Sequence, residues 1–435
     1  MKQNQAKKQN YALPIAIMFA LFFMIAFVTG YQNPLGSVIE KMSSGNRIMS
    51  QLGTLANFIA YAFMGYPAGK LLQNRGFRVT ALWAVTVGFA GVAVTYFSGF
   101  IAADSTAVAV YLTGAFIAGF SMCLLNTVVN PMLNSLGSTP NKGNQLVQFG
   151  GSCNSLGATL APVIVGGLLG GSASSISSAN PVFYLAMAIF AAAFIVLFFS
   201  KLPESPDLGK PQARVKTSNA FRYRNFTFGV IAIFCYVGLE VGVANWTYQY
   251  LEKHELITDN AAAIAGTVCG VYWLMMLVGR LIGGAVGARV SSRAMLTFVS
   301  LGAMVFLLLG IFTSESMVPF FGFDSKALAF NIVQIPLNAI FLVLCGIFAS
   351  VMWGAIFNLS VMGLGKYTAV ASGIFMVMVC GGGIFPAIQA LIAGHAGTLT
   401  SFWLPFALAA YIFVYAVALS RPTPGLPDEK ETLTE

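Results

Sequence analysis

The chain has 435 residues, of which 57% are apolar and only 9% are charged. A soluble globular domain carries about 25% charged residues, so a surface built from this composition could not be solvated. The composition therefore excludes a water-soluble protein and indicates an integral membrane protein. The net charge of +9 is interpreted as a signal of membrane topology and not as a nucleic-acid-binding surface, and no nucleic-acid partner is expected.

Charged residues divide the chain into long uncharged stretches, and a membrane-spanning helix needs roughly 20 apolar residues. The stretches are, in chain order, 9–39, 48–69, 79–103, 105–141, 143–200, 225–251 (broken only by Glu240), 260–279, 294–314, 327–365 and 367–420. Two of them, 143–200 and 367–420, are long enough for two helices each. The sequence therefore predicts twelve transmembrane helices in an all-α membrane protein.

Two other interpretations of these segments are rejected. A closed β-barrel is the only other structure that can span a bilayer, but the stretches lack strand alternation and are too long for tilted strands. The first apolar segment, Leu13–Tyr31, is not followed by a small-residue cleavage site. It is therefore predicted to be the first helix and not a signal peptide.

The basic residues predict the orientation of the chain. If both termini are cytoplasmic, all but four of the 23 Lys and Arg residues fall on the inner side, and Arg280 is counted among them. The four outer ones are Lys41, Arg47, Lys253 and Lys326. An excess of Lys and Arg in cytoplasmic loops is the usual pattern, so we expect a multi-pass protein of the plasma (inner) membrane with both ends inside.

One long polar segment divides the chain into two equal halves. The predicted organisation is a six-helix bundle at 1–200, a basic, Pro-rich cytoplasmic linker at 201–224, a second six-helix bundle at 225–421 and a flexible tail at 422–435. Two six-helix halves are typical of duplicated transporters, whose sites lie near the midplane between the halves.

Glu240 is the only acidic residue deep inside a predicted span. A carboxylate at bilayer depth is costly, and by default it marks a functional site. It could exchange a proton near neutrality, bind sodium or accept hydrogen bonds from a substrate. The structural alternative is a salt bridge, but no Lys or Arg is predicted at the same depth.

Amide side chains form the second group of candidates. Asn126, Asn130 and Asn134 follow one another at intervals of four residues and so share one helix face. The next helix carries Gln148 and Asn154. Amides donate and accept hydrogen bonds, as sugar hydroxyls do, although they also hold helices together in membranes.

Further candidates lie in the second half of the chain. Ligand pockets are mostly apolar with a few placed polar groups, and aromatic rings stack on the apolar faces of sugar rings. The candidates are Asn245, Trp246, Gln249, Trp273, Trp353 and Asn358.

The sequence lacks a phosphate-binding loop, a metal-ligand cluster and a nucleophile triad, and none of its six cysteines forms a CxxC pair. It predicts no enzyme and no cofactor other than a coupling ion, a proton or sodium.

Three stretches resemble the major facilitator superfamily, and within it the fucose/glucose/galactose permease family of sugar symporters. They are the helix 4–5 residues Asn126-Thr-Val-Val-Asn130-Pro131 with Asn154-Ser155-Leu156-Gly157-Ala158, the helix 7 residues Phe234–Gly242, and residues Gly346–Gly373. The resemblance implies two pseudo-symmetric six-helix bundles and hexose uptake by alternating access, driven by protons or sodium.

The chain departs from that family at three positions. Asn126 and Ser37 stand where the resemblance implies Glu and Asp, the expected proton-coupling pair. Gln73 stands where the superfamily carries an Asp. If the resemblance holds, Glu240 is the remaining candidate for ion coupling.

The sequence thus predicts a cation-coupled importer of a monosaccharide, a monomer in contact with membrane lipid. Three alternatives stay open: a passive sugar facilitator, an efflux antiporter for drugs or metabolites, and a sugar sensor that does not transport.

Overall fold

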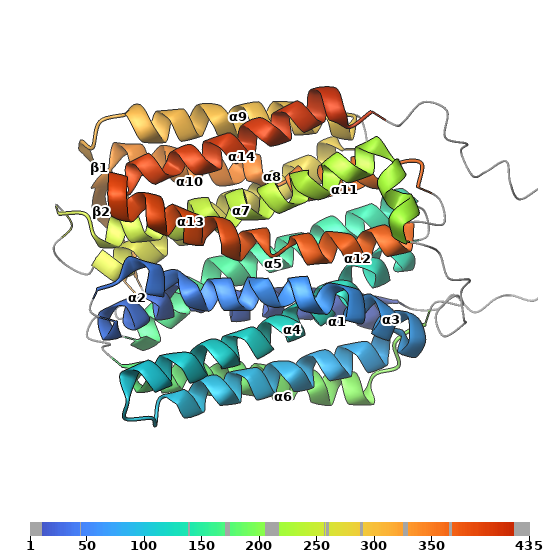
Figure 1. Ribbon diagram of the computed structural model, residues 1–435, viewed down its shortest axis with the longest axis horizontal. Coiled ribbons are helices and arrows are strands. Elements are labelled where there is room, and N and C mark those ends of the chain that lie inside the picture. The colour runs from blue at the N-terminus through green and yellow to red at the C-terminus, as the bar shows by residue number, and fades with distance from the viewer. Residues whose placement is uncertain are drawn as a thin grey trace, which may run out of the picture.

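The computed structural model describes residues 11–43, 45–137, 140–169, 175–204, 217–255, 257, 261–287, 290–324, 329–364 and 368–421. Its long helices run side by side along one common direction (Figure 1). The predicted tail at 422–435 and the larger part of the predicted linker, 205–216, lie outside the described residues. The division of the chain into two bundles at these boundaries stays a prediction.

The N-terminal half of the chain is built from six α-helices. They are α1 (Ala12–Gly30), α2 (Gln32–Met42), α3 (Arg47–Ser98), α4 (Asp104–Leu136), α5 (Pro140–Leu169) and α6 (Asn180–Phe199), with a short 3₁₀ helix, η1 (Ile176–Ala179), before α6.

The C-terminal half begins with the 3₁₀ helix η2 (Thr217–Arg222). Its longer helices are α7 (Arg224–Glu252), α8 (Ala261–Val286), α9 (Ser292–Phe312), α10 (Leu337–Ala349), α11 (Met352–Val361), α12 (Thr368–Met378), α13 (Gly381–Ala396) and α14 (Trp403–Val414). Two short turns, η4 (Leu399–Phe402) and η5 (Tyr415–Leu419), flank α14.

Eleven helices in the described part of the chain are long and apolar enough to cross a membrane. One of them, Ile48–Ser98, has 51 residues, about twice what a bilayer requires. It breaks at Gly76, whose φ of 78° is not helical. Counting the two parts of α3 separately gives the predicted twelve segments.

The predicted helix at 327–365 is wrong in its first part. Residues Met317–Asp324 form strand β1 and Ala329–Pro336 form β2, an antiparallel pair that precedes α10. An uncharged stretch of that length exceeds one span, and the surplus folds as a hairpin at the end of the bundle (Figure 1). We call this end, where α2 also lies, the hairpin end; α1 begins and η5 ends at the opposite, terminal end.

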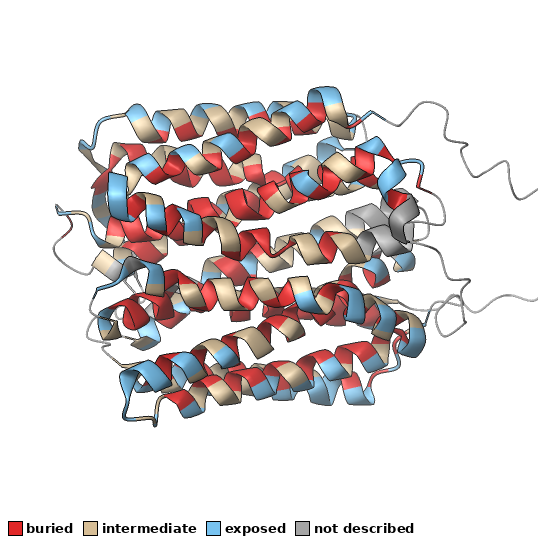
Figure 2. Cartoon of the chain, in the orientation of Figure 1, coloured by how far each residue is buried: buried red, intermediate tan, exposed pale blue. Residues whose placement is uncertain are grey.

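Helix α7 forms the centre of the C-terminal half. Nearly all of its residues from Val230 to Leu251 are buried, whereas outer helices such as α9 expose one apolar side (Figure 2). Glycines let neighbouring helices approach it closely: a Cβ at Gly381 of α13 would lie 2.2 Å from the Phe234 carbonyl oxygen of α7. Small residues at such contacts allow membrane helices to pack closely.

A carboxylate that is distant in the sequence stabilises the break at Gly76. Glu204, which follows α6, accepts hydrogen bonds from the backbone N–H groups of Phe77 (2.7 Å) and Arg78 (3.0 Å). These N–H groups open the second part of α3 and have no partner within the helix. Glu204 therefore acts as the cap of a helix to which it is not joined in sequence.

We expect Glu204→Gln to lower the thermal unfolding midpoint in detergent, because an amide oxygen cannot accept both bonds as a carboxylate does. Loss of a helix cap costs about 1 kcal/mol. Glu255→Gln, which removes an exposed carboxylate elsewhere, is the control. Equal midpoints for the two variants would show that Glu204 does not hold the break.

Candidate functional site

Glu240 lies in the middle of α7 and has a cationic partner, Arg280 of α8. Their Oε1 and Nη2 atoms are 3.5 Å apart, and the two side chains are only 14% and 11% exposed. The prediction that no Lys or Arg lies at the depth of Glu240 is therefore wrong. Arg280 was assigned to the cytoplasmic side, but α8 continues for six more residues to Val286.

Arg280 also joins the two halves of the chain. Its Nη1 donates to the Ser155 hydroxyl (2.8 Å) and to the Gly151 carbonyl, both on α5. Its Nε donates to the carbonyl of Ser350, between α10 and α11, at 3.4 Å. The Arg280 guanidinium thus contacts the Glu240 carboxylate on α7, the Ser155 hydroxyl on α5 and the backbone between α10 and α11.

Aromatic side chains surround the acid. Tyr272 of α8 donates its hydroxyl to the Glu240 backbone carbonyl at 3.1 Å. One turn before the acid, Tyr236 is fully buried and packs edge-on against Trp353, with ring centroids 6.2 Å apart. The Tyr236 hydroxyl makes no hydrogen bond of ordinary geometry within the described residues, but it lies close enough to interact with the charges of Glu240 and Arg280.

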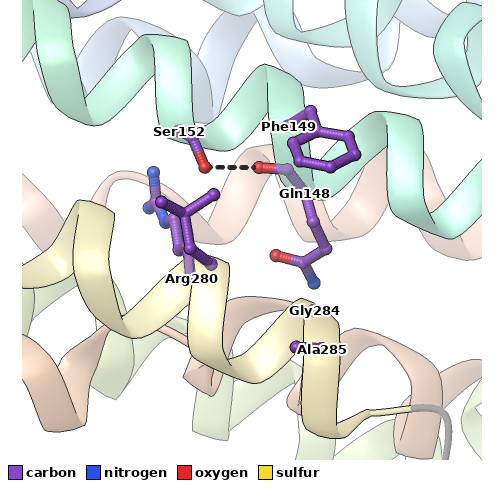
Figure 3. Close-up of a pocket in the computed structure, with 7 residues that line it drawn as sticks. Gln148, Phe149, Ser152, Arg280, Gly284 and Ala285 are labelled. Carbon is purple, nitrogen blue, oxygen red and sulfur yellow. Dashed lines mark hydrogen bonds between the residues drawn. The ribbon is translucent and has the colours of Figure 1, made fainter.

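A small pocket opens beside Arg280, between α5 and α8 (Figure 3). It is lined by Gln148, Phe149, Ser152, Arg280, Leu281, Gly284 and Ala285 and has a volume of about 160 Å³. Small-molecule sites usually measure about 300–1,000 Å³. In this conformation the pocket is too small for a complete ligand site, but it places an amide, a hydroxyl and a guanidinium together.

Three predicted site residues therefore belong to one neighbourhood: Glu240, Gln148 and Trp353. Gln148 approaches the second half closely, because a Cβ at Gly354 of α11 would lie 2.9 Å from its Nε2. Asn358 lies one turn after Gly354 and is exposed. Trp273 is half-buried and packs edge-on against Tyr272.

The helix 4 and helix 5 amides make contacts within the N-terminal half. Asn126 donates to the Tyr61 hydroxyl at 3.0 Å, and Asn130 donates to the Asn126 carbonyl of its own helix at 3.0 Å. Asn154 donates to the Phe22 carbonyl of α1 at 3.0 Å. The side chain of Asn134 lies outside the described residues.

The remaining predicted residues are buried nearer the hairpin end of α7. The Trp246 ring nitrogen donates to the Pro386 carbonyl at 3.1 Å, and Asn245 donates to Gln51 of α3 at 3.2 Å. Gln249 is 3% exposed. Asn245 thus bonds the opposite half of the chain in this conformation.

Two further polar contacts close the hairpin end between the halves. Ser37 of α2 donates to Glu252 of α7 at 2.8 Å, and Lys253 pairs with Glu40 of α2 at 2.6 Å. The sequence predicted only that Lys253 lies on the outer side and did not reveal these partners, because nothing in the sequence aligns α2 with the end of α7.

We expect Lys253→Glu to lower the thermal unfolding midpoint, since it sets two carboxylates against each other. The double change Glu40→Lys with Lys253→Glu should recover most of the loss, with a coupling of up to about 1 kcal/mol for a partly exposed pair. A double variant no more stable than the worse single variant would contradict the pairing.

Comparison with known proteins identifies the fold. The family model of the Major Facilitator Superfamily matches residues 15–385. A glucose/galactose transporter of Brucella abortus is 28% identical over 96% of each chain, and the L-fucose-proton symporter of Escherichia coli is 22% identical over 95% of this chain and 94% of that one. A crystal structure of the Escherichia coli fucose:proton symporter superposes with a TM-score of 0.69 at 21% identity, covering 94% and 98% of the two chains.

The match covers most of the chain and confirms the fold expected from the sequence resemblance. The chain belongs to the major facilitator superfamily, and it is a multi-pass membrane transporter and not an enzyme.

Proposed function

We propose that this transporter imports a neutral monosaccharide, a hexose such as glucose, galactose or fucose, by cation-coupled alternating access. The observation that carries the proposal is the Glu240–Arg280 pair, because Arg280 bonds the acid in one half and Ser155 in the other. The substrate class is supported by the relatives, which are named as glucose/galactose and L-fucose transporters.

The pair gives a physical route from ion binding to conformational change. A ligand or ion shifts a conformational equilibrium only if it interacts differently with the two states. A proton on Glu240 would cancel the charge that faces Arg280, leaving the guanidinium held by α5 and by Ser350. The strength of the contact between the halves would then depend on whether Glu240 is protonated.

A proton suits this site better than sodium. Sodium would have to lie beside a guanidinium only 3.5 Å from the acid, and like charges at such a distance repel. One relative is named as a proton symporter. The residues proposed to bind sugar are Asn126, Asn130, Gln148, Asn154, Asn245, Trp246, Gln249, Trp273, Trp353 and Asn358, with amides bonding hydroxyls and Trp rings lining the sugar.

The proposed orientation places both termini in the cytoplasm of an inner membrane and the hairpin end outside. With Ser37, Glu40 and Asn245 bonded across the halves, the conformation described here is closed on the outer side. The protein is proposed to act as a monomer, since the contacting halves belong to one chain.

The test is uptake of labelled hexoses by purified protein in liposomes, with an inward proton or sodium gradient imposed separately. Accumulation above equilibrium with the proton gradient supports the proposal, and an ionophore that collapses the gradient should abolish it. Accumulation with sodium alone would reassign the ion. Saturable uptake that only equilibrates would make the protein a passive facilitator, and no saturable hexose uptake would overturn the substrate class.

A further inference from the structure

The hairpin is connected by short linkers to two helices that cross the membrane. Strand β1 begins at Met317, shortly after α9 ends at Phe312, and α10 begins at Leu337, directly after β2 ends. Both neighbours are membrane-crossing helices. The short linkers hold the base of the hairpin at the ends of these helices, and the strands lie across that end of the bundle (Figure 1).

The two faces of the hairpin differ in their surroundings. Side chains alternate between the faces of a strand. On one face, Val318, Phe320 and Val333 pack against the core of the protein. On the other face, Phe321 and Ile332 lie directly opposite each other in the strand register and are 73% and 75% exposed.

The helix that precedes the hairpin also carries exposed apolar side chains. Helix α9 exposes Phe298 and Phe312 to 70% and 72%, as expected for side chains that contact acyl chains. Phe312 packs against Trp403 at the start of α14, with ring centroids 5.9 Å apart, and aromatic residues of this kind gather at membrane boundaries. Phe321 and Ile332 follow in sequence and are exposed to the same degree.

We propose that the Phe321–Ile332 face of the hairpin inserts into the lipid surface at the hairpin end and anchors the α9–α10 connection there. An isolated two-stranded hairpin is marginally stable in water, so packing against the protein on one face and lipid on the other explains its formation. A second protein copy is disfavoured, because two side chains provide far less than the roughly 800 Å² per partner that a stable interface buries.

Adjacent residues of β2 provide a matched pair of probes. Ile332→Cys and Asn331→Cys place a thiol on opposite faces of the strand, and both native residues are exposed. Each variant of the full chain is labelled with an environment-sensitive fluorophore and reconstituted into liposomes. The unmodified chain corrects for its six native cysteines, five of which are buried. Quenching is measured with lipids that carry a nitroxide near the headgroup and with aqueous iodide.

The expected result is several-fold stronger quenching by nitroxide lipid at position 332 than at position 331, and the reverse order with iodide. Equal quenching at the two positions overturns the proposal. Quenching at position 332 by iodide alone overturns it as well and places the face in water. Self-quenching that rises with the protein-to-lipid ratio would identify a second copy as the occupant. These outcomes do not depend on which solute is transported.

Discussion

Exchanging Glu240 for glutamine is expected to abolish accumulation of sugar above equilibrium in liposomes while exchange of sugar across the membrane stays measurable. Glutamine has nearly the shape of glutamate and can still accept a hydrogen bond from Arg280, but it cannot gain or lose a proton. The variant would therefore keep the alternating movement and lose its dependence on the ion gradient. The measurement is labelled-hexose accumulation under an imposed gradient, compared with exchange in preloaded liposomes.

Glu255→Gln is the matched control, because it makes the same chemical change at an exposed carboxylate. It should accumulate sugar at temperatures below its unfolding transition. Accumulation that survives in Glu240→Gln would refute the assignment of coupling to this acid. A loss of both accumulation and exchange would instead make Glu240 essential for binding or movement.

Replacing Arg280 by methionine is expected to destabilise the protein strongly, because Glu240 would be left buried without its cation. The Ser155 hydroxyl and the Gly151 carbonyl would lose their donor as well. Removing one partner of a buried ion pair costs about 3–5 kcal/mol. The thermal unfolding midpoint in detergent should fall clearly, and little folded protein should be recovered at elevated temperature.

A second change distinguishes this cause from a general loss of packing. Adding Glu240→Gln to Arg280→Met removes the unpaired charge, so the double variant should be more stable than Arg280→Met alone. Arg280→Lys keeps the charge but offers no planar fork for several acceptors, and an intermediate midpoint is expected. If the double variant is less stable than the single one, the charge of Glu240 is not the source of the loss.

The membrane class and the helical segments could be predicted, and Glu240 could be singled out as a candidate, because each depends on a strong local signal. A run without charges predicts a span, and one acid inside such a run is conspicuous. The break of α3 at Gly76 fitted the predicted loop, since Lys70, Arg75 and Arg78 already separated two spans. The roles of the predicted sugar-binding residues stay predictions.

The pairing of Arg280 with Glu240 and the hairpin were missed for a common reason. Charged residues were assumed to mark the ends of helices, and uncharged stretches were assumed to be helical. Arg280 ended one uncharged stretch, although the apolar residues Leu281–Val286 follow it and extend the helix past it. That extension, together with a buried acid in need of a cation, was the available signal. For the hairpin, the signal was a run of 39 residues at 327–365 with Pro336 inside it.

The contacts that close the hairpin end consist of charges and hydrogen-bonding groups, and the Lys253 side chain is 32% exposed. Dissolved ions screen partly exposed pairs of this kind over about 8 Å at physiological ionic strength. Opening that end would exchange these polar contacts for contacts with water and dissolved ions. With the hairpin end outside, as proposed, salt outside the cell is expected to weaken the Lys253–Glu40 pair, so dilute media should prolong the closed state and saline media should shorten it.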